Sequence, residues 1–186
     1  MPIQNMRYAA FFRNLNLGRP NCPTRVQLES AFLEAGASEA QSFLTNGTIA
    51  FHAGGIRSAK KILAAASESM EASCGLVEPA FLREIPYLAT LVDAQPFKSI
   101  DRDAVYECCV TFLHPKAAIP RGCPQASPRG DVKIVQVTDS EVLSISYKPG
   151  KTPGSPNAFL EKALALPATT RAWNTVVRLV GKHADR

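Results

Sequence analysis

At residues 41–52 the chain reads QSFLTNGTIAFH, and the expected topology of the first half follows from this stretch. Its dipeptide Asn46-Gly47 stands between two β-rich runs and is the strongest short-range signal for a hairpin, because both turn positions favour a positive φ. A two-residue turn would pair Leu44 with Ile49 across the two strands. Leu44, Ile49 and Phe51 would then share the face that packs on the core, since alternate residues of a strand point to the same side.

Further elements are expected on both sides of this hairpin. Thr24 and Gln27 form a capping box that begins a helix with its apolar residues on one face. Ser58 is the expected N-cap of a second helix, which ends near Gly75. The strands are expected near residues 7–13, 41–45, 48–52 and 77–83. The resulting βαββαβ order predicts a ferredoxin-like antiparallel sheet with both helices on one face.

The second half of the chain is expected to form another α+β unit. A short helix is expected from Pro86, a strand at 106–113 and a hairpin with strands at 132–137 and 142–147. Two helices follow, one from Ser155 and one from about Thr170 to Val180. The predicted fold class is therefore α+β with antiparallel sheets. We expect a ferredoxin-like subdomain at residues 1–85 and an intertwined α+β subdomain with C-terminal helices at residues 86–186.

Length and composition describe an ordinary globular protein. The chain has 186 residues, of which 46% are hydrophobic and 20% are charged. No apolar run approaches the roughly 20 residues that a membrane-spanning helix needs. The first residues lack the basic stretch, apolar run and cleavage site of a secretory signal. We therefore expect a cytoplasmic protein without a membrane partner.

The cysteines favour the same reducing compartment. Five of them are scattered through the chain, at positions 22, 74, 108, 109 and 123. An odd, scattered set without a signal peptide is a poor disulfide framework, so we expect reduced thiols. No C-x-x-C motif occurs and the three histidines lie far apart in sequence, so neither a metal site nor a cofactor is predicted. The cysteines are then buried or unreactive thiols. The alternative is a zinc site whose ligands are distant in sequence and are brought together by folding.

The positive charge is unevenly distributed along the chain. The net charge is +5, and the stretch from Lys148 to Arg186 holds seven Lys or Arg against two acids. The preceding 147 residues are balanced, with 14 basic and 14 acidic groups. This pattern favours an anionic ligand near the C-terminal part, and a solubilising helical face is the alternative.

Two stretches are unusually dense in polar residues, RNLNLG at 13–18 and TTRAWNT at 169–175. Together with FLTNGT at 43–48 and AQPF at 94–97, in this order and at these spacings, they resemble an uncharacterised bacterial family, domain of unknown function 1697. The resemblance covers nearly the whole chain. It implies a cytoplasmic bacterial protein with a ferredoxin-like first part and an intertwined second part, and it supplies no catalytic residue.

The excess charge and the polar stretches together point to a site for a small anion. If the last helix begins as expected, Arg171 and Asn174 share one of its faces beside free N–H groups at the positive helix end. Arg13 and Asn16 follow the first strand, and Lys151 lies in a Gly/Pro-rich loop. We expect Arg13, Asn16, Lys151, Arg171 and Asn174 to converge on one concave ligand-binding surface between the halves.

Each of these residues also has an ordinary structural role open to it. Arg13 can pair with Glu84 or Asp93 instead of facing a ligand. Arg171 can stay solvated next to a simple helix cap. Trp173, on the apolar side of the same helix, is expected to anchor the core rather than to stack on a ligand.

The sequence leaves open whether the protein is an enzyme. It has no nucleophile elbow, no H-E-x-x-H and no dinucleotide fingerprint. The Gly-Lys-Thr at 150–152 is not a phosphate loop, because Ile145 replaces the first required glycine and Pro153 removes a backbone donor. The first hypothesis is therefore binding of a small phosphate- or carboxylate-bearing ligand by a monomer or homodimer. The alternative is a nucleic-acid or protein interaction module, which is less favoured because no RNP-type aromatic run occurs.

Overall fold

The computed structural model describes residues 6–119 and 123–184. These residues form two compact units. The first contains the described chain up to Ala89 and, in addition, the described residues from Leu179 onward. The second contains Thr90–Arg178. The sequence-based boundary was placed after residue 85, with the whole last helix in the second subdomain, whereas here the end of that helix groups with the first unit.

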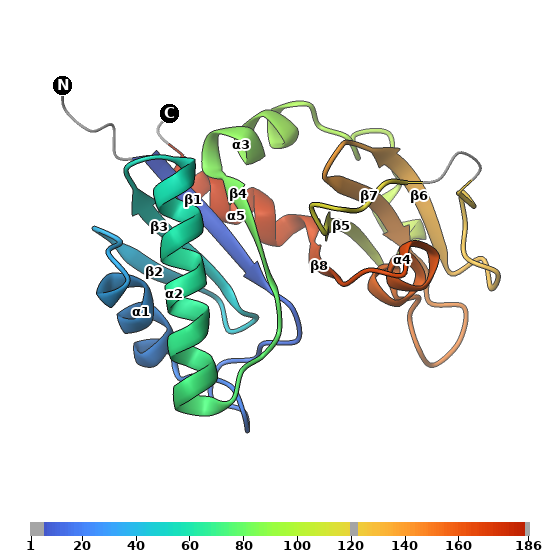
Figure 1. Ribbon diagram of the computed structural model, residues 1–186. Coiled ribbons are helices and arrows are strands. Elements are labelled where there is room, and N and C mark those ends of the chain that lie inside the picture. The colour runs from blue at the N-terminus through green and yellow to red at the C-terminus, as the bar shows by residue number, and fades with distance from the viewer. Residues whose placement is uncertain (1–5, 120–122, 185–186) are drawn as a thin grey trace. The chain divides into compact units, whose positions relative to one another are not determined.

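The first unit is built on an antiparallel sheet of four strands with the order β2-β3-β1-β4 (Figure 1). Its elements in chain order are β1 (Met6–Phe12), α1 (Arg25–Glu34), β2 (Ala40–Phe43), β3 (Thr48–Ala53), α2 (Ile56–Cys74) and β4 (Ala80–Glu84). The predicted βαββαβ order and the antiparallel sheet are thus confirmed. In this arrangement β1 lies between β3 and β4, so the first strand of the chain is central.

The two long helices of this unit follow partly from local sequence signals. The capping box before α1 is present: the Thr24 Oγ accepts from the Gln27 N–H at 3.2 Å, and the Gln27 side chain accepts from the Thr24 N–H at 2.8 Å. The prediction that Ser58 caps α2 is wrong, because the helix begins at Ile56 with Gly55 as its N-cap. Gly55 has a φ of 134°, a conformation that side chains with a Cβ rarely adopt, and this allows the earlier entry into the helix.

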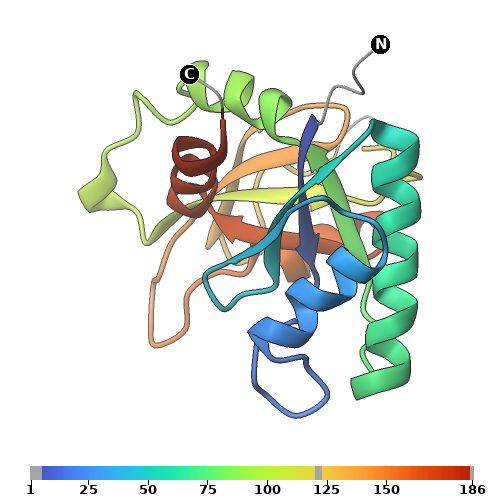
Figure 2. The same cartoon turned by 90° about the vertical axis from the view of Figure 1, so that its left-hand side faces the viewer.

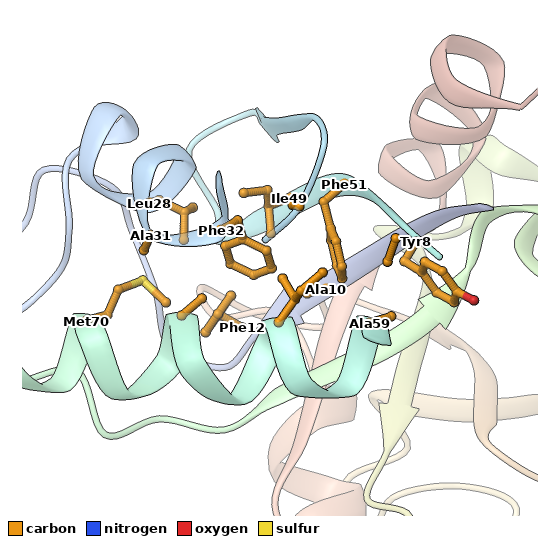
Figure 3. Packing of buried hydrophobic residues seen from close by; sticks show 14 of the residues in the cluster. Tyr8, Ala10, Phe12, Leu28, Ala31, Phe32, Ile49, Phe51, Ala59 and Met70 are labelled. Atoms are coloured by element: carbon orange, nitrogen blue, oxygen red, sulfur yellow. The ribbon is translucent and has the colours of Figure 1, made fainter. Parts of the chain in front are cut away.

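The core of the first unit lies between the sheet and both helices (Figure 3). Phe32 of α1 is central to it, with ring centroids 6.3 Å from Phe12 and 4.9 Å from Phe51. Met70 of α2 closes the other side. Since one cluster contains residues of β1, β3, α1 and α2, both helices cover the same face of the sheet, as predicted (Figure 2).

The hairpin between β2 and β3 differs from the predicted one in its turn. Ser42 lies opposite Ile49, so the turn has four residues instead of two and Leu44 is part of it, with a φ of 59°. The prediction that Leu44 pairs with Ile49 is therefore wrong. The register shift is two residues, so Ile49 and Phe51 keep the core-facing side that was expected.

The longer turn is held by the loop after β1. The Phe12 N–H donates to the Gly47 carbonyl at 2.8 Å, and the Leu17 N–H donates to the Thr45 carbonyl at 2.9 Å. Leu15 packs so closely on Gly47 that a Cβ at position 47 would collide with the leucine side chain. These tertiary contacts override the local preference of Asn46-Gly47 for a two-residue turn.

The second unit contains the other four-stranded antiparallel sheet, in the order β6-β7-β5-β8. Its strands are β5 (Glu107–Leu113), β6 (Val132–Val137), β7 (Glu141–Ser146) and β8 (Ala168–Ala172). The remaining elements are α3 (Ile85–Asp93), which starts before the boundary, a 3-10 turn η1 (Arg102–Ala104), α4 (Pro156–Leu164) and α5 (Trp173–His183). The predicted α+β class with antiparallel sheets is confirmed in this unit as well.

Strand β8 corrects the prediction for the last helix. Residues 168–172, expected to include the start of that helix, pair with β5 instead, with Arg171 opposite Val110 and Thr170 opposite Thr111. The hydroxyl oxygens of Thr170 and Thr111 are 2.8 Å apart. The β-branched pair at 169–170 fits a strand, and it supplies this cross-strand contact. Helix α5 then begins directly at Trp173, so Arg171 and Asn174 do not share a helical face.

Candidate functional site: a charged pocket of the first unit

Two of the predicted site residues, Arg13 and Asn16, lie in the loop that follows β1. The Arg13 guanidinium pairs with Glu78 at 2.7 Å, not with Glu84 or Asp93 as considered from the sequence. The Asn14 amide donates to the other Glu78 oxygen at 3.1 Å. The Asn16 side chain is exposed, and its backbone carbonyl accepts from the Arg19 N–H. Arg13 thus ties this loop to the segment before β4.

The other three predicted residues belong to the second unit. Arg171 is 7% exposed on β8, and its guanidinium donates to the Thr169 hydroxyl at 2.8 Å and to the Thr170 carbonyl at 3.0 Å. Burial lowers the pKa of Arg171 to about 10. Lys151 and Asn174 are exposed, in the loop before α4 and in the first turn of α5. The convergence of all five residues stays a prediction.

The four motif stretches found in the sequence come together in pairs inside each unit. The loop at 13–18 contacts the turn at 43–48 through the hydrogen bond from Leu17 to Thr45 and through the packing of Leu15 on Gly47. The stretch at 94–97 meets 169–175 through Phe97 and Trp173, whose ring centroids are 5.4 Å apart with an interplanar angle of 63°. In the first unit the contact between the motif stretches fixes a loop, and in the second unit it is the packing of two aromatic rings.

Several charged and titratable side chains of the first unit surround one cavity. We call this cavity, of about 660 Å³, the Arg7 pocket. It lies beside β2 and β3 and is also lined by α1 and by the end of α5. Its ionisable lining residues are three cations, two acids and two histidines: Arg7, Arg25, Lys182, Glu29, Glu39, His52 and His183.

Arg7 connects the two histidines of the pocket. Its Nε donates to His52 Nε2 at 2.7 Å, and its Nη1 donates to the His183 backbone carbonyl at 2.7 Å. Arg7 and His52 are direct neighbours on the paired strands β1 and β3. The short contact requires a lone pair on His52 Nε2, so the proton of a neutral His52 is on Nδ1. His52 Nδ1 in turn lies 3.6 Å from a Glu39 carboxylate oxygen.

His183 brings a second imidazole to the pocket from the last turn of α5. Its ring packs edge-on near Phe43, with centroids 6.5 Å apart. Its Nε2 is buried and has no hydrogen-bond partner among the residues that the structure describes. Burial lowers the pKa of His183, and the nearby charges of Lys182, Arg7 and His52 lower it further, against an opposing effect of Glu39. His183 is thus a neutral imidazole at pH 7, with one nitrogen that no described residue contacts by a hydrogen bond.

The two acids of the pocket, Glu29 and Glu39, differ in their hydrogen bonding and exposure. Glu29 is engaged, because one of its oxygens accepts from both the Ser42 N–H at 2.8 Å and the Ser42 hydroxyl at 2.7 Å. This contact closes an outward backbone donor of β2, which is an edge strand. Glu39 has a side chain that is 76% exposed. Apart from the histidines, the lining has three cations, Arg7, Arg25 and Lys182, against these two acids, which is an excess of one positive charge.

Sequence reasoning missed this pocket, although one signal for it was present. In a βαββαβ sheet the first and third strands are neighbours, so Arg7 and His52 at corresponding strand ends are expected to meet. The contribution of Lys182 and His183 had no such signal, because it depends on where the end of α5 returns to the first unit.

The described residues also bear on metal clusters, thiols and membrane-spanning helices. No group of three or more His, Cys, Asp or Glu residues is arranged to hold a metal ion in the described ranges. All five cysteines are free. Burial raises the pKa of Cys109 to about 12, with smaller contributions from Glu107 and Cys108, which makes this thiol unreactive. None of the helices in the described part of the chain has the length and apolar character to cross a membrane.

Comparison with known proteins gives a fold and a family without an activity. The solved structure of the conserved bacterial protein SP0830 from Streptococcus pneumoniae is similar, with a TM-score of 0.67 and 13% sequence identity, over 97% of this chain and 99% of that chain. At this identity the similarity concerns the fold alone. No curated protein matches the sequence. A family model, described as protein of unknown function (DUF1697), matches residues 6–142. The chain therefore belongs to the DUF1697 family.

Proposed function

We propose that the protein binds a small phosphate- or carboxylate-bearing ligand in the Arg7 pocket. The observation that carries the proposal is the grouping of Arg7, Arg25 and Lys182 around one cavity. The cavity volume falls in the range of about 300–1,000 Å³ that is typical of small-molecule sites. The separate five-residue site at Arg13, Asn16, Lys151, Arg171 and Asn174 stays an untested alternative for the same ligand class.

The residues of the pocket divide the work in this proposal. Arg7 is held in place by His52 and by the His183 carbonyl, so its charge is positioned before a ligand arrives. Arg25 and Lys182 are exposed and supply the mobile cations that close on an anion. The charges of Lys182 and Arg7 disfavour the protonated His183, and an anion between these cations offsets them. An anion in the pocket therefore favours proton uptake by His183.

The proposal includes a cytoplasmic location and a small ligand rather than a polymer. Five free cysteines support a reducing compartment. The pocket also contains Glu29 and Glu39, whose charges would repel a continuous polyanion lying along this edge. Binding of a polyanion would weaken steeply with added salt, whereas a pocketed small anion responds weakly.

The test measures the melting temperature in sodium phosphate against sodium chloride at equal ionic strength. We expect phosphate to raise the melting temperature of the wild-type protein by mass action. The double variant Arg25→Gln/Lys182→Gln should lose most of this increase. The matched control Arg57→Gln, which removes an exposed cation of α2 outside the pocket, should keep it.

Three results would decide against the Arg7 pocket. An equal phosphate response in the double variant and in the control would show that these cations do not bind the anion. A response lost in Lys151→Gln and kept in the double variant would move the anion to the five-residue site. A phosphate response that vanishes with moderate salt in every protein would favour the polyanion alternative.

A further inference from the structure

A second cavity, in the other unit, has a different chemical character. It has a volume of about 460 Å³, and all residues lining it belong to the second unit. Its walls come from the end of α3, the connection to η1 and the first two turns of α5. We call it the aromatic pocket, because Phe97 and Trp173 line it together with aliphatic side chains.

The aromatic pair gives this pocket a rigid wall. Phe97 and Trp173 are 3% and 5% exposed, and their rings meet nearly edge to face at 5.4 Å. This is a favoured arrangement for aromatic pairs, so both rings are fixed before a ligand enters. The aliphatic part of the wall is formed by Val92, Ile100 and Val177. The pocket wall would therefore lose little conformational freedom when a flat apolar ligand binds there.

The charges at this wall are all of one sign among the described residues that line it. Lys98 and Arg102 contribute two cations, and none of the lining residues is acidic. The guanidinium carbon of Arg102 lies 5.9 Å from the centre of the Phe97 ring, which orients it over the aromatic face. The neighbouring Asp101 carboxylate accepts from the Asp103 N–H at 3.0 Å and caps η1. The pocket thus pairs an apolar wall with an excess of positive charge.

We propose that the aromatic pocket binds a small aromatic carboxylate. The ring of such a ligand would lie against Trp173 and the aliphatic wall, and its carboxylate would pair with Arg102 and Lys98. A planar guanidinium can meet a carboxylate through two parallel hydrogen bonds while it stacks on a ring. This site goes beyond the proposed function and does not rest on it, because the two pockets share no lining residue.

The experiment uses Trp173 as a reporter, since it is the single tryptophan of the chain. The full-length protein is titrated with benzoate while the intrinsic tryptophan fluorescence is recorded. Acetate, which has the charge without the ring, and benzyl alcohol, which has the ring without the charge, are the ligand controls. We expect a saturable change with benzoate and none with either control at the same concentration.

Three variants then test which cation pairs with the benzoate carboxylate. Arg102→Gln should raise the benzoate dissociation constant about tenfold, as expected for the loss of one charge-assisted contact. Lys98→Gln should raise it less. Lys133→Gln removes an exposed cation of β6 outside the pocket and should leave it unchanged. Circular dichroism checks that each variant is folded, and all three replaced side chains are exposed.

Three results would overturn the proposal. One is the absence of a saturable fluorescence change with benzoate at millimolar concentration. Another is an equal change with acetate or benzyl alcohol, which would indicate an ionic or a solvent effect. The third is a benzoate affinity of Arg102→Gln that equals that of Lys133→Gln.

Discussion

The Arg7 pocket and the aromatic pocket are assembled in opposite ways. The aromatic pocket uses a nearly continuous stretch, 92–102, plus two residues of α5. The Arg7 pocket draws on β1, α1, the β2–β3 hairpin and the end of α5, which are far apart in sequence. In the aromatic pocket, two buried rings form the wall and the two cations are exposed. In the Arg7 pocket, an arginine connects two histidines in a hydrogen-bonded group. Both pockets have an excess of positive charge, but the contacts that hold their arginines differ: Arg102 lies over the Phe97 ring, whereas Arg7 is hydrogen-bonded to His52.

Helix α5 contributes to both pockets, which makes it the element to perturb first. Its first turns supply Trp173 and Val177 to the aromatic pocket, and its last turn supplies Lys182 and His183 to the Arg7 pocket. Trp173 packs in the interior, whereas Lys182 is exposed. Substitutions along this one helix should therefore range from strongly destabilising to neutral.

The largest effect is expected for Trp173→Ala. Removal of a buried aromatic side chain leaves a cavity and costs about 3–5 kcal/mol of unfolding free energy. Trp173→Phe should cost clearly less, because an aromatic contact to Phe97 is kept. Urea denaturation followed by circular dichroism measures both. A loss below about 1 kcal/mol in Trp173→Ala would mean that the wall is not a packed part of the core.

The next effect is expected for Arg7→Gln. The substitution removes the donors to His52 and to the His183 carbonyl, and it should cost about 1–3 kcal/mol by the same measurement. It should also abolish the phosphate-induced rise in melting temperature while leaving the benzoate titration unchanged. If Arg7→Gln were as stable as the exposed control Arg57→Gln, the hydrogen-bonded group would not organise the pocket.

A smaller effect is expected from pH, through His183. Its pKa is lowered in the folded protein relative to an unfolded value of about 6.5. Below that pH the unfolded chain binds a proton that the folded chain resists, so stability falls as the pH decreases from about 6.5 towards the folded pKa. His183→Gln should reduce this pH dependence, measured as urea midpoints between pH 7.5 and 5. Phosphate should reduce it in the wild type as well, because an anion favours the protonated imidazole.

The groups facing His183 decide how that pH result is read. Lys182, Arg7 and His52 disfavour its protonation, and Glu39 favours it. Glu39→Gln should therefore steepen the loss of stability at low pH. An identical pH profile in wild type and His183→Gln would assign the titration to another group of the pocket.

The smallest effect on stability is expected for the exposed cations, and it gives the sharpest test of the comparison. Arg25→Gln and Arg102→Gln should each change the unfolding free energy by less than about 0.5 kcal/mol. Arg25→Gln should weaken phosphate binding alone, and Arg102→Gln should weaken benzoate binding alone. A variant that weakened both ligands equally would show that the two pockets are not independent.

Part of this molecule could be predicted from the sequence, where a local signal had no tertiary competitor. Thr24 and Gln27 cap α1 as expected, and Ser155 caps α4 with its hydroxyl accepting from the Ala158 N–H. The hairpin signal at Asn46-Gly47 gave the correct pair of strands and the wrong turn, because the loop after β1 binds the turn carbonyls. Local preference therefore determined which strands pair, and contacts from elsewhere determined the turn.

The candidate site shows the same division. Arg171 belonged to a predicted helix start by its neighbours Thr169 and Thr170, yet β5 offered these residues a strand partner and the helix begins later. The α+β class, the βαββαβ order and the core-facing side of Ile49 and Phe51 could be predicted from the sequence, because these follow from periodicity and capping within short segments. Only the tertiary structure decided that Arg7, His52 and His183 come together, since the end of α5 reaches the first unit through packing that no local pattern encodes.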